Sequence, residues 1–300
     1  MLNFDKLALG TAQWGMVYGV ANEDGIASDI TVRNILNKAQ NVGVDLLDTA
    51  YIYGKSETIL GLNKISKNGF RVITKTMPLE KMGGTDKYSI EEINRTFLRS
   101  LAKLQTENVY SLLIHKANDL LGNSGDMLWS MLEGLKSEGL VNKIGCSVYD
   151  VTQLNTLIDR YDMELVQLPY NIFNQSYITS GVAEKVKKKK IEVHARSIFL
   201  QGLLLIKPNK LPEYFSELYN HHFSFWNECK ELNLSPLEAT LGFCMANKYI
   251  DKVIVGCEKL TQWKEIIVAT KKNLDFNTIR SLEKFSIEND SYTNPSNWKI

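Results

Sequence analysis

Eight short runs of apolar, β-prone residues recur along the chain, and longer stretches with a helical spacing of apolar residues separate them. The runs are LALGT (7–11), VDLLD (44–48), RVITK (71–75), SLLIH (111–115), KIGCS (143–147), LVQLP (165–169), VHARS (193–197) and VIVG (253–256). Short apolar runs with polar residues at their ends are typical of buried strands. The pattern therefore predicts eight strands joined by helical segments.

The segments between the runs have the pattern of amphipathic helices with defined starts. Between the first two runs, apolar residues recur at i, i+3, i+4 and i+7, at Val32, Ile35, Leu36, Ala39 and Val42. Side chains that can accept hydrogen bonds from free helical N–H groups mark three further starts. They are Ser89 and Ser235, each three residues before a glutamate, and Asp150.

Strands that alternate with helices favour a parallel sheet with right-handed crossovers, and eight such units close into a (β/α)8 barrel at about this length. A doubly wound open sheet is the alternative. When it binds dinucleotides it usually carries a GxGxxG turn after its first strand, and LALGTAQWG has none. We therefore expect one barrel domain over residues 1–300, with a tail at about 285–300 that contributes to the mouth of the active site.

Composition and charge make a small molecule the expected binding partner. Among 300 residues, 35 Lys and Arg balance 34 Asp and Glu, so no strong field favours nucleic acid or an anionic membrane. The N-terminus carries Asp5 and Lys6 where a signal peptide would be apolar, which predicts a cytoplasmic protein. The four cysteines are far apart and match no metal-ligand spacing, so we expect reduced thiols and no metal site.

Polar residues stand where the predicted strands end, which is where a barrel builds its active site. The second, third and fourth runs end in Asp48, Lys75 and His115, and Tyr53 follows the second run. Any one of them alone is more typical of a helix cap or a solvated turn. An acid, a phenol, an ammonium and an imidazole on three successive strands together favour a catalytic site.

These four residue types suit the reduction of a carbonyl group. A phenol with an ordinary pKa near 10 donates its proton poorly at neutral pH, but a neighbouring ammonium such as Lys75 would lower the pKa of Tyr53. Asp48 would hold that ammonium in place, and His115 would orient the carbonyl oxygen. The four residues predict a general acid at Tyr53 that needs a hydride donor beside it.

At this point the sequence resembles the aldo-keto reductases, a family of NADP(H)-linked (β/α)8 barrels, in a bacterial-type form. The resemblance runs from about residue 6 to about residue 270, in the stretches LGTAQWG, VDLLDTAYIYG, VITKTM, SLLIHK, KIGCSVYD, LVQLPYN, ARSIFLQGLL and VIVGCEKLTQWKE. It implies a catalytic tetrad of Asp48, Tyr53, Lys75 and His115, the same four residues that the strand ends point to.

The resemblance also implies cofactor contacts at Thr11, Ser147, Gln167, Arg196, Ser197, Gly256, Gln262 and Glu265. Two positions depart from the family pattern at the nicotinamide. Val148 replaces an asparagine that contacts the carboxamide, and Arg196 replaces a stacking aromatic residue. A guanidinium there can stack, but its charge disfavours the oxidised ring, which predicts a bias toward reduction.

At the adenosine end, the family's NADP-selecting arginine corresponds to Gln262, and Glu258 beside it would repel a 2'-phosphate. Lys259 would compensate, and Glu265 matches an acid that contacts adenine. The predicted cofactor is NADP(H), with NAD(H) as the alternative.

Aromatic residues near the strand ends are candidate walls of the substrate site. These are Trp14, Tyr18 and Tyr51, together with Tyr292 and Trp298 in the C-terminal tail. Such rings can stack on the face of a sugar, so we expect a polar carbonyl substrate, for example a keto sugar. The assembly is expected to be a monomer or a small homo-oligomer.

Two other features are interpreted as structural. The basic run at 185–190 precedes the seventh strand and His221 adjoins His222, with no metal pattern around either feature.

Three functions stay open. The first function is a carbonyl reductase of the aldo-keto type. The second is a non-catalytic nucleotide-binding barrel with a regulatory role. The third is an aldolase in which Lys75 forms a Schiff base, although an ammonium paired with a carboxylate is a poor nucleophile.

Overall fold

The computed structural model describes residues 4–82 and 87–298. Eight parallel strands close into a barrel in chain order, because β8 pairs with β1. They are β1 (Leu7–Gly10), β2 (Leu46–Asp48), β3 (Arg71–Lys75), β4 (Val109–Ile114), β5 (Val141–Ser147), β6 (Leu165–Pro169), β7 (Glu192–Arg196) and β8 (Lys252–Gly256). The predicted (β/α)8 barrel is confirmed, and every predicted run contributes a strand.

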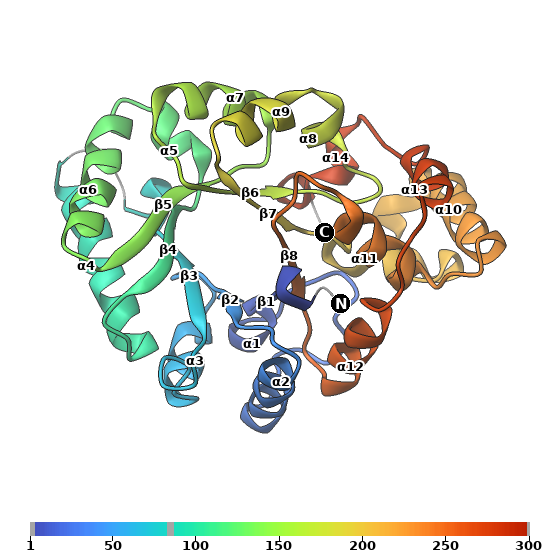
Figure 1. Ribbon diagram of the computed structural model, residues 1–300, viewed down its shortest axis with the longest axis horizontal. Coiled ribbons are helices and arrows are strands. Elements are labelled where there is room, and N and C mark those ends of the chain that lie inside the picture. The colour runs from blue at the N-terminus through green and yellow to red at the C-terminus, as the bar shows by residue number, and fades with distance from the viewer. Residues whose placement is uncertain (1–3, 83–86, 299–300) are drawn as a thin grey trace.

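Helices surround the strands, and α10 and α13 extend on the right of the view in Figure 1. The α-helices are α1 (Ala12–Gly15), α2 (Asp29–Asn41), α3 (Ser56–Leu62), α4 (Lys87–Leu104), α5 (Ala117–Leu121), α6 (Gly125–Ser137), α7 (Val151–Arg160), α8 (Ser176–Thr179), α9 (Val182–Lys188), α10 (Tyr219–Glu231), α11 (Pro236–Ala246), α12 (Leu260–Ala269), α13 (Phe276–Glu283) and α14 (Asp290–Thr293). Short 3-10 helices are η1 (Phe4–Lys6), η2 (Leu79–Lys81), η3 (Leu200–Leu205), η4 (Pro208–Lys210), η5 (Glu213–Leu218) and η6 (Pro295–Asn297).

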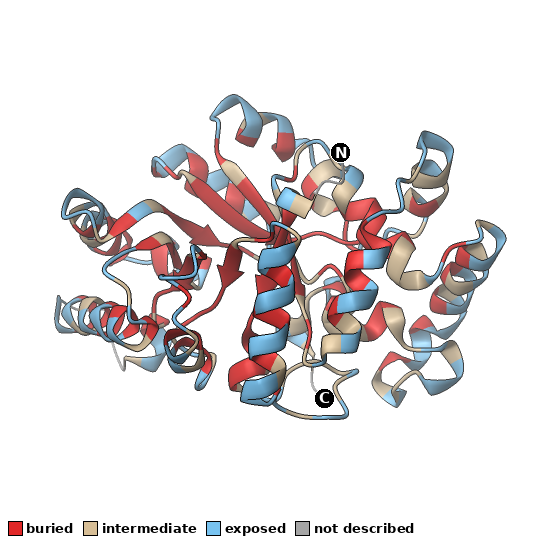
Figure 2. Ribbon diagram, turned by 60° about the horizontal axis from the view of Figure 1, so that its bottom comes forward, coloured by how far each residue is buried: buried red, intermediate tan, exposed pale blue. Residues whose placement is uncertain are grey.

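The strands carry apolar side chains on both faces because the barrel buries both. Outward-facing residues pack under the helices, whose exposed stripes appear pale blue in Figure 2 while the strands are red. Inward-facing residues form a separate layer inside the barrel: Ala8, Leu46, Ile73, Leu113, Leu165 and Ile254. Because side chains alternate along a strand, the residue two positions after each of these points to the same interior.

Two of the three helix starts predicted from capping residues are confirmed. The side chains of Asp150 and Ser235 accept hydrogen bonds from the first turns of α7 and α11, and Ser235 forms the predicted capping box. The prediction for Ser89 is wrong, because α4 already begins at Lys87 and Ser89 lies within its first turn. The predicted apolar face of α2 is buried at Val32, Ile35, Leu36 and Ala39.

The N-terminal end of the barrel is filled by a polar network around Glu192. One carboxylate oxygen lies 2.7 Å from Nε2 of His194, and the other lies 2.5 Å from Nζ of Lys143 and 2.6 Å from the hydroxyl of Tyr110. The paired charges lower the pKa of Glu192 despite its burial. This end of the barrel has the interlocked side chains expected of the face that stabilises the fold.

Two further observations concern the chain as a whole. Within residues 4–82 and 87–298, no helix is long and apolar enough to cross a membrane. The four cysteines, Cys146, Cys229, Cys244 and Cys257, are free and buried.

Helices α3 and α4 approach so closely that only glycine fits at position 61. A Cβ atom there would lie 2.0 Å from the carbonyl oxygen of Lys103, whereas a Cβ atom at Gly134 in α6 would meet nothing within 4 Å. We expect Gly61→Ala to lower the free energy of unfolding by about 3 kcal/mol through overpacking. Gly134→Ala, the matched control, should raise it by about 0.5–1 kcal/mol. Denaturant unfolding measures both, and equal effects would contradict the close approach.

Candidate active site

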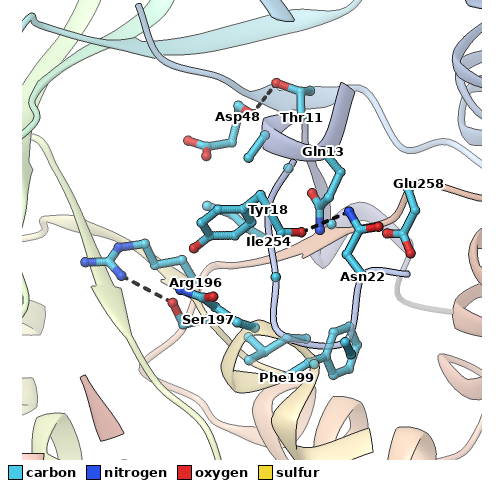
Figure 3. A pocket seen from close by; sticks show the side chains of 18 of the residues that line it. Thr11, Gln13, Tyr18, Asn22, Asp48, Arg196, Ser197, Phe199, Ile254 and Glu258 are labelled. Atoms are coloured by element: carbon cyan, nitrogen blue, oxygen red, sulfur yellow. Dashed lines mark hydrogen bonds between the residues drawn. The ribbon is translucent and has the colours of Figure 1, made fainter. Parts of the chain in front are cut away.

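Above the apolar layer inside the barrel lies a ring of inward-facing polar residues and glycines. Each of them follows a residue of the apolar layer by two positions, and they are Gly10, Asp48, Lys75, His115, Gln167 and Gly256. All six line a pocket at the C-terminal ends of the strands, which we call the barrel pocket, and Tyr53 also lines it. Part of it is shown in Figure 3. The structure thus brings together the four residues of the predicted tetrad.

An ion pair between Asp48 and Lys75 forms the floor of the barrel pocket. Their Oδ1 and Nζ atoms are 2.7 Å apart, and the two side chains are only 6% and 1% exposed. The ammonium also donates to the carbonyl oxygen of Thr49 at 2.9 Å. Burial lowers the pKa of Lys75, while the charge of Asp48 and its hydrogen bond act in the opposite direction.

Tyr53 lies over this ion pair and beside His115. The ammonium of Lys75 is 5.2 Å from the centroid of the phenol ring, and the rings of Tyr53 and His115 meet edge to face at 6.0 Å. Loss of solvation raises the pKa of Tyr53, the charge of Asp48 raises it further, and Arg196 opposes them. The expectation that Lys75 lowers this pKa is wrong, because burial and the carboxylate dominate.

His115 is a neutral imidazole at physiological pH. Burial, then the charges of Lys75 and Arg196, lower its pKa to about 3. Its backbone N–H donates to Oγ1 of Thr76, and Nδ1 is buried with no hydrogen-bond partner among the described residues. A neutral ring keeps one N–H donor and one acceptor for a bound ligand.

Gln167 and Ser147 stand side by side at the ends of β6 and β5, where their Cα atoms pair in the register. Nε2 of Gln167 donates to Oδ1 of Asp48 at 2.7 Å, and its Oε1 atom is buried without a partner among the described residues. A buried amide oxygen without a partner is unusual unless a ligand supplies the donor. Val148, beyond Ser147, buries its side chain in the outer core.

Arg196 forms one wall of the barrel pocket at the end of β7. Its guanidinium lies 3.8 Å from the ring centroid of Tyr149 and donates to the carbonyl oxygen of Val148 at 2.9 Å. It also donates to Oγ of Ser197 at 3.3 Å. None of the carboxylates in the described residues forms an ion pair with Arg196. The positive charge therefore faces the barrel pocket without a protein counter-ion.

All eight predicted cofactor residues line the barrel pocket: Thr11, Ser147, Gln167, Arg196, Ser197, Gly256, Gln262 and Glu265. Thr11 fixes the β1 end, since its hydroxyl donates to the carbonyl oxygen of Asp48 at 3.0 Å. The pocket is tight around Gly256, where a Cβ atom would lie 2.6 Å from Oε1 of Gln13. The sequence did not identify Gln13 as a lining residue.

At the start of α12, the side chain of Gln262 folds back over the preceding residues. Its Oε1 atom accepts from the backbone N–H groups of Glu258 and Lys259, and its Nε2 atom donates to the Glu258 carboxylate at 2.7 Å. Lys259 forms an ion pair with Asp24 from the loop after β1. Figure 3 shows Glu258 beside Asn22, on the other side of the view from Arg196.

Three of the predicted substrate walls are wrong. Trp14 is fully buried and donates through Nε1 to the carbonyl oxygen of Cys257, so it belongs to the core. Tyr51 lies under Lys103, whose Nζ is 4.1 Å from the ring centroid. Trp298 packs edge to face on Phe215 at 4.9 Å. None of the three lines the barrel pocket, and among the described residues none beyond Ile266 lines it. The contribution of the tail at about 285–300 to the mouth stays a prediction.

Further walls of the barrel pocket come from the loops after β1, β5 and β7, at Tyr18, Asn22, Tyr149, Phe199 and Gln201. Of these, only Tyr18 was expected from the sequence. Tyr149 lies two residues beyond the end of β5, so its position is the signal that could have identified it. Gln201 lies in a segment with left-handed backbone at several non-glycine residues, and nothing in the sequence indicates that conformation.

The two features interpreted as structural have partners within the fold. Lys185 of the basic run forms an ion pair with Asp159 at 2.5 Å. Nε2 of His222 lies 3.0 Å from the carbonyl oxygen of Leu203, and burial lowers its pKa. Among the described residues, no group of histidines, cysteines and acids has the arrangement of a metal site.

Comparison with known proteins places these residues in context. Residues 6–287 match the model of the aldo/keto reductase family. The L-galactose dehydrogenase of Arabidopsis thaliana is 26% identical over 303 residues, which cover 94% of this chain and 90% of that protein. The NADH-specific methylglyoxal reductase of Escherichia coli (strain K12) is 25% identical over 220 residues, covering 68% and 66%. The structure of aldo-keto reductase AKR11C1 from Bacillus halodurans (holo form) has the same fold, with a TM-score of 0.76 at 20% identity and coverage of 98% and 95%.

Because Asp48 and Lys75 form a buried ion pair, we expect neutralising Asp48 to lower the stability of the protein strongly. In Asp48→Asn the buried ammonium of Lys75 loses its counter-ion, and leaving one partner of a buried pair without the other costs about 3 kcal/mol. We expect the free energy of unfolding, measured by denaturant titration, to fall by this amount. Asp45→Asn is the matched control, since the side chains of Arg71 and Asp45 are 39% and 46% exposed and the loss should stay below about 1 kcal/mol. Equal losses in the two variants would contradict the buried pair.

Proposed function

Since this chain belongs to the aldo/keto reductase family, we propose that it reduces an aldehyde or ketone to an alcohol with NADH or NADPH as the hydride donor, and that Tyr53 is the general acid. The observation that carries the proposal is the meeting of Tyr53, His115 and the Asp48–Lys75 ion pair at one end of the barrel. These groups come from three strand ends and converge on a single space in the pocket.

The barrel pocket has features that fit a nicotinamide cofactor. The unpartnered Oε1 atom of Gln167 offers an acceptor for the carboxamide N–H groups, and Ser147 stands beside it. Gly256 leaves room at the end of β8, where any larger residue would have to displace the end of the Gln13 side chain. Arg196 would stack on the ring, and the loop before α12 would hold the adenosine end. When bound, the cofactor supplies a hydride to the carbonyl carbon.

The residues of the tetrad then have distinct roles. The neutral His115 donates its N–H to the carbonyl oxygen and orients it, and Tyr53 delivers its proton to that oxygen as negative charge develops there. Lys75, whose ammonium lies 5.2 Å from the centroid of the phenol ring, would stabilise the phenolate that Tyr53 leaves behind. Asp48 keeps the ammonium in position and compensates its charge.

The pocket walls favour a small polar carbonyl compound such as a keto sugar. Tyr18 and Gln201 present a hydroxyl and an amide group, and Arg196 adds an unpaired positive charge. The similar proteins from Arabidopsis thaliana and Escherichia coli are named for a sugar and for methylglyoxal, both small and polar. A screen in which only steroids or lipid aldehydes are turned over would overturn this choice of substrate class.

Two other functions receive less support. A Schiff base at Lys75 needs a free amine, but its nitrogen is held by Asp48 and by the carbonyl oxygen of Thr49. A non-catalytic nucleotide-binding barrel would have no need for an intact tetrad, and all four residues are present and converge.

Removing the phenolic hydroxyl of Tyr53 tests the reductase proposal directly. We expect Tyr53→Phe to lower kcat by at least about 100-fold, the usual contribution of a general acid, while the dissociation constant of the cofactor changes less than about threefold. Steady-state kinetics and fluorescence titration measure the two quantities. Tyr51→Phe is the matched control from the same loop, and it should leave both unchanged because Tyr51 lies outside the pocket. Full activity in Tyr53→Phe would reject the assignment.

The low pKa of His115 predicts a flat pH profile on the acidic side. A group whose pKa is lowered to about 3 stays neutral throughout the range in which an ordinary histidine, near 6.5, gains its charge. Tyr53 stays protonated over the same range because its pKa is raised. We expect kcat for reduction to stay constant within about twofold from about pH 5.5 to 8. An inflection near 6.5 that disappears in His115→Gln would contradict the neutral imidazole.

A further inference from the structure

We propose that the loop before α12 makes this protein selective for NADH over NADPH, and that Glu258 is the residue responsible. The inference rests on the proposed function, because it presumes that a dinucleotide occupies the barrel pocket with its nicotinamide at the tetrad. The two nucleotides differ only in the 2'-phosphate on the adenosine ribose, so selectivity depends on the charge at the end of the pocket away from the tetrad.

That end of the pocket is acidic. Glu258 and Glu265 both line it, and the lining carries no lysine or arginine other than Lys75 and Arg196, which lie at the tetrad end. A 2'-phosphate brings close to two negative charges at neutral pH, and carboxylates a few ångströms away would repel it. The charges of the lining therefore favour a ribose that carries a hydroxyl group.

Gln262 occupies the hydrogen-bond donors that a phosphate would need. Helix N-termini bind phosphates through free backbone N–H groups, but those of Glu258 and Lys259 both donate to Oε1 of Gln262, at 3.0 and 3.1 Å. The same side chain donates to the Glu258 carboxylate. Gln262 thus occupies two backbone N–H groups that could otherwise bind a phosphate, and it holds the Glu258 carboxylate beside them.

Lys259 does not compensate for this acidity. Its ammonium forms an ion pair with Asp24, and Glu23 adds further negative charge around it. Asp24 is held by a turn that Asn22 organises, since Oδ1 of Asn22 accepts from the backbone N–H groups of Asp24 and Gly25 and Nδ2 donates to the carbonyl oxygen of Gly25. The lysine is therefore directed to the loop after β1.

A carboxylate at this position has a positive role as well. The 2'-hydroxyl of the ribose is a donor, and an acidic side chain that accepts from it is a general means by which proteins select NAD over NADP. Glu258 keeps its second oxygen available, because only Oε1 accepts from Gln262 among the described residues. The geometry thus provides both an attraction for NADH and a repulsion for NADPH.

The test is a fluorescence titration of the whole protein with NADH and with NADPH, using the tryptophans as the reporter. We expect the dissociation constant for NADPH to exceed that for NADH by at least about tenfold. In Glu258→Gln the ratio should fall at least about fivefold, through weaker NADH binding and stronger NADPH binding. Glu258→Asp keeps the charge and should retain a preference for NADH.

The matched control is Glu23→Gln, which removes an acid of the same region that does not line the pocket, and its ratio should change less than about twofold. Circular dichroism and thermal unfolding confirm that each variant is folded. Tighter binding of NADPH to the wild type, or a ratio that Glu258→Gln leaves unchanged, would overturn the inference. Failure of both nucleotides to bind would instead reject the proposed function itself, so the two failures are distinguishable.

Discussion

The site depends on one buried ion pair, between Asp48 and Lys75. Either charge alone at the floor of an apolar barrel would be costly, because desolvating a single ion takes several kcal/mol, a large part of the stability of an ordinary protein. Together, and with Gln167 and the carbonyl oxygen of Thr49 as further partners, they are tolerated. The partners come from β2, β3 and β6, so the barrel has to close correctly before the pair is satisfied. The chemistry of the pocket and the stability of the fold are coupled at this point.

The alternation of side chains along the strands explains how this polar floor could be predicted. An apolar residue such as Leu46, Ile73 or Leu113 faces the barrel interior, and two positions later the same strand presents Asp48, Lys75 or His115. The period of a strand therefore determines which residues meet above the apolar layer. For this reason the eight strands and the positions of Asp48, Lys75 and His115 could be predicted from the sequence.

The loops were less predictable because no short period governs them. Trp14 follows the end of β1 and Tyr51 follows the end of β2, yet one is buried against Cys257 and the other lies under Lys103 on α4. Which way an aromatic side chain turns in a loop depends on partners far away in the chain. The pKa of Tyr53 was misjudged for a similar reason, since the effect of burial depends on everything that surrounds the ring.

This division between strands and loops has a functional meaning. The strand ends hold Asp48, Lys75 and Gln167, and their arrangement permits little variation because Asp48 has partners on both β3 and β6. The residues that would distinguish one nucleotide from another lie on the loops after β1 and β8, where Glu258 and Asp24 contact neighbours but not the floor. Exchanging a charge there would leave the ion pair and the barrel intact. A fold of this kind can therefore keep one reaction while its cofactor and its substrate change.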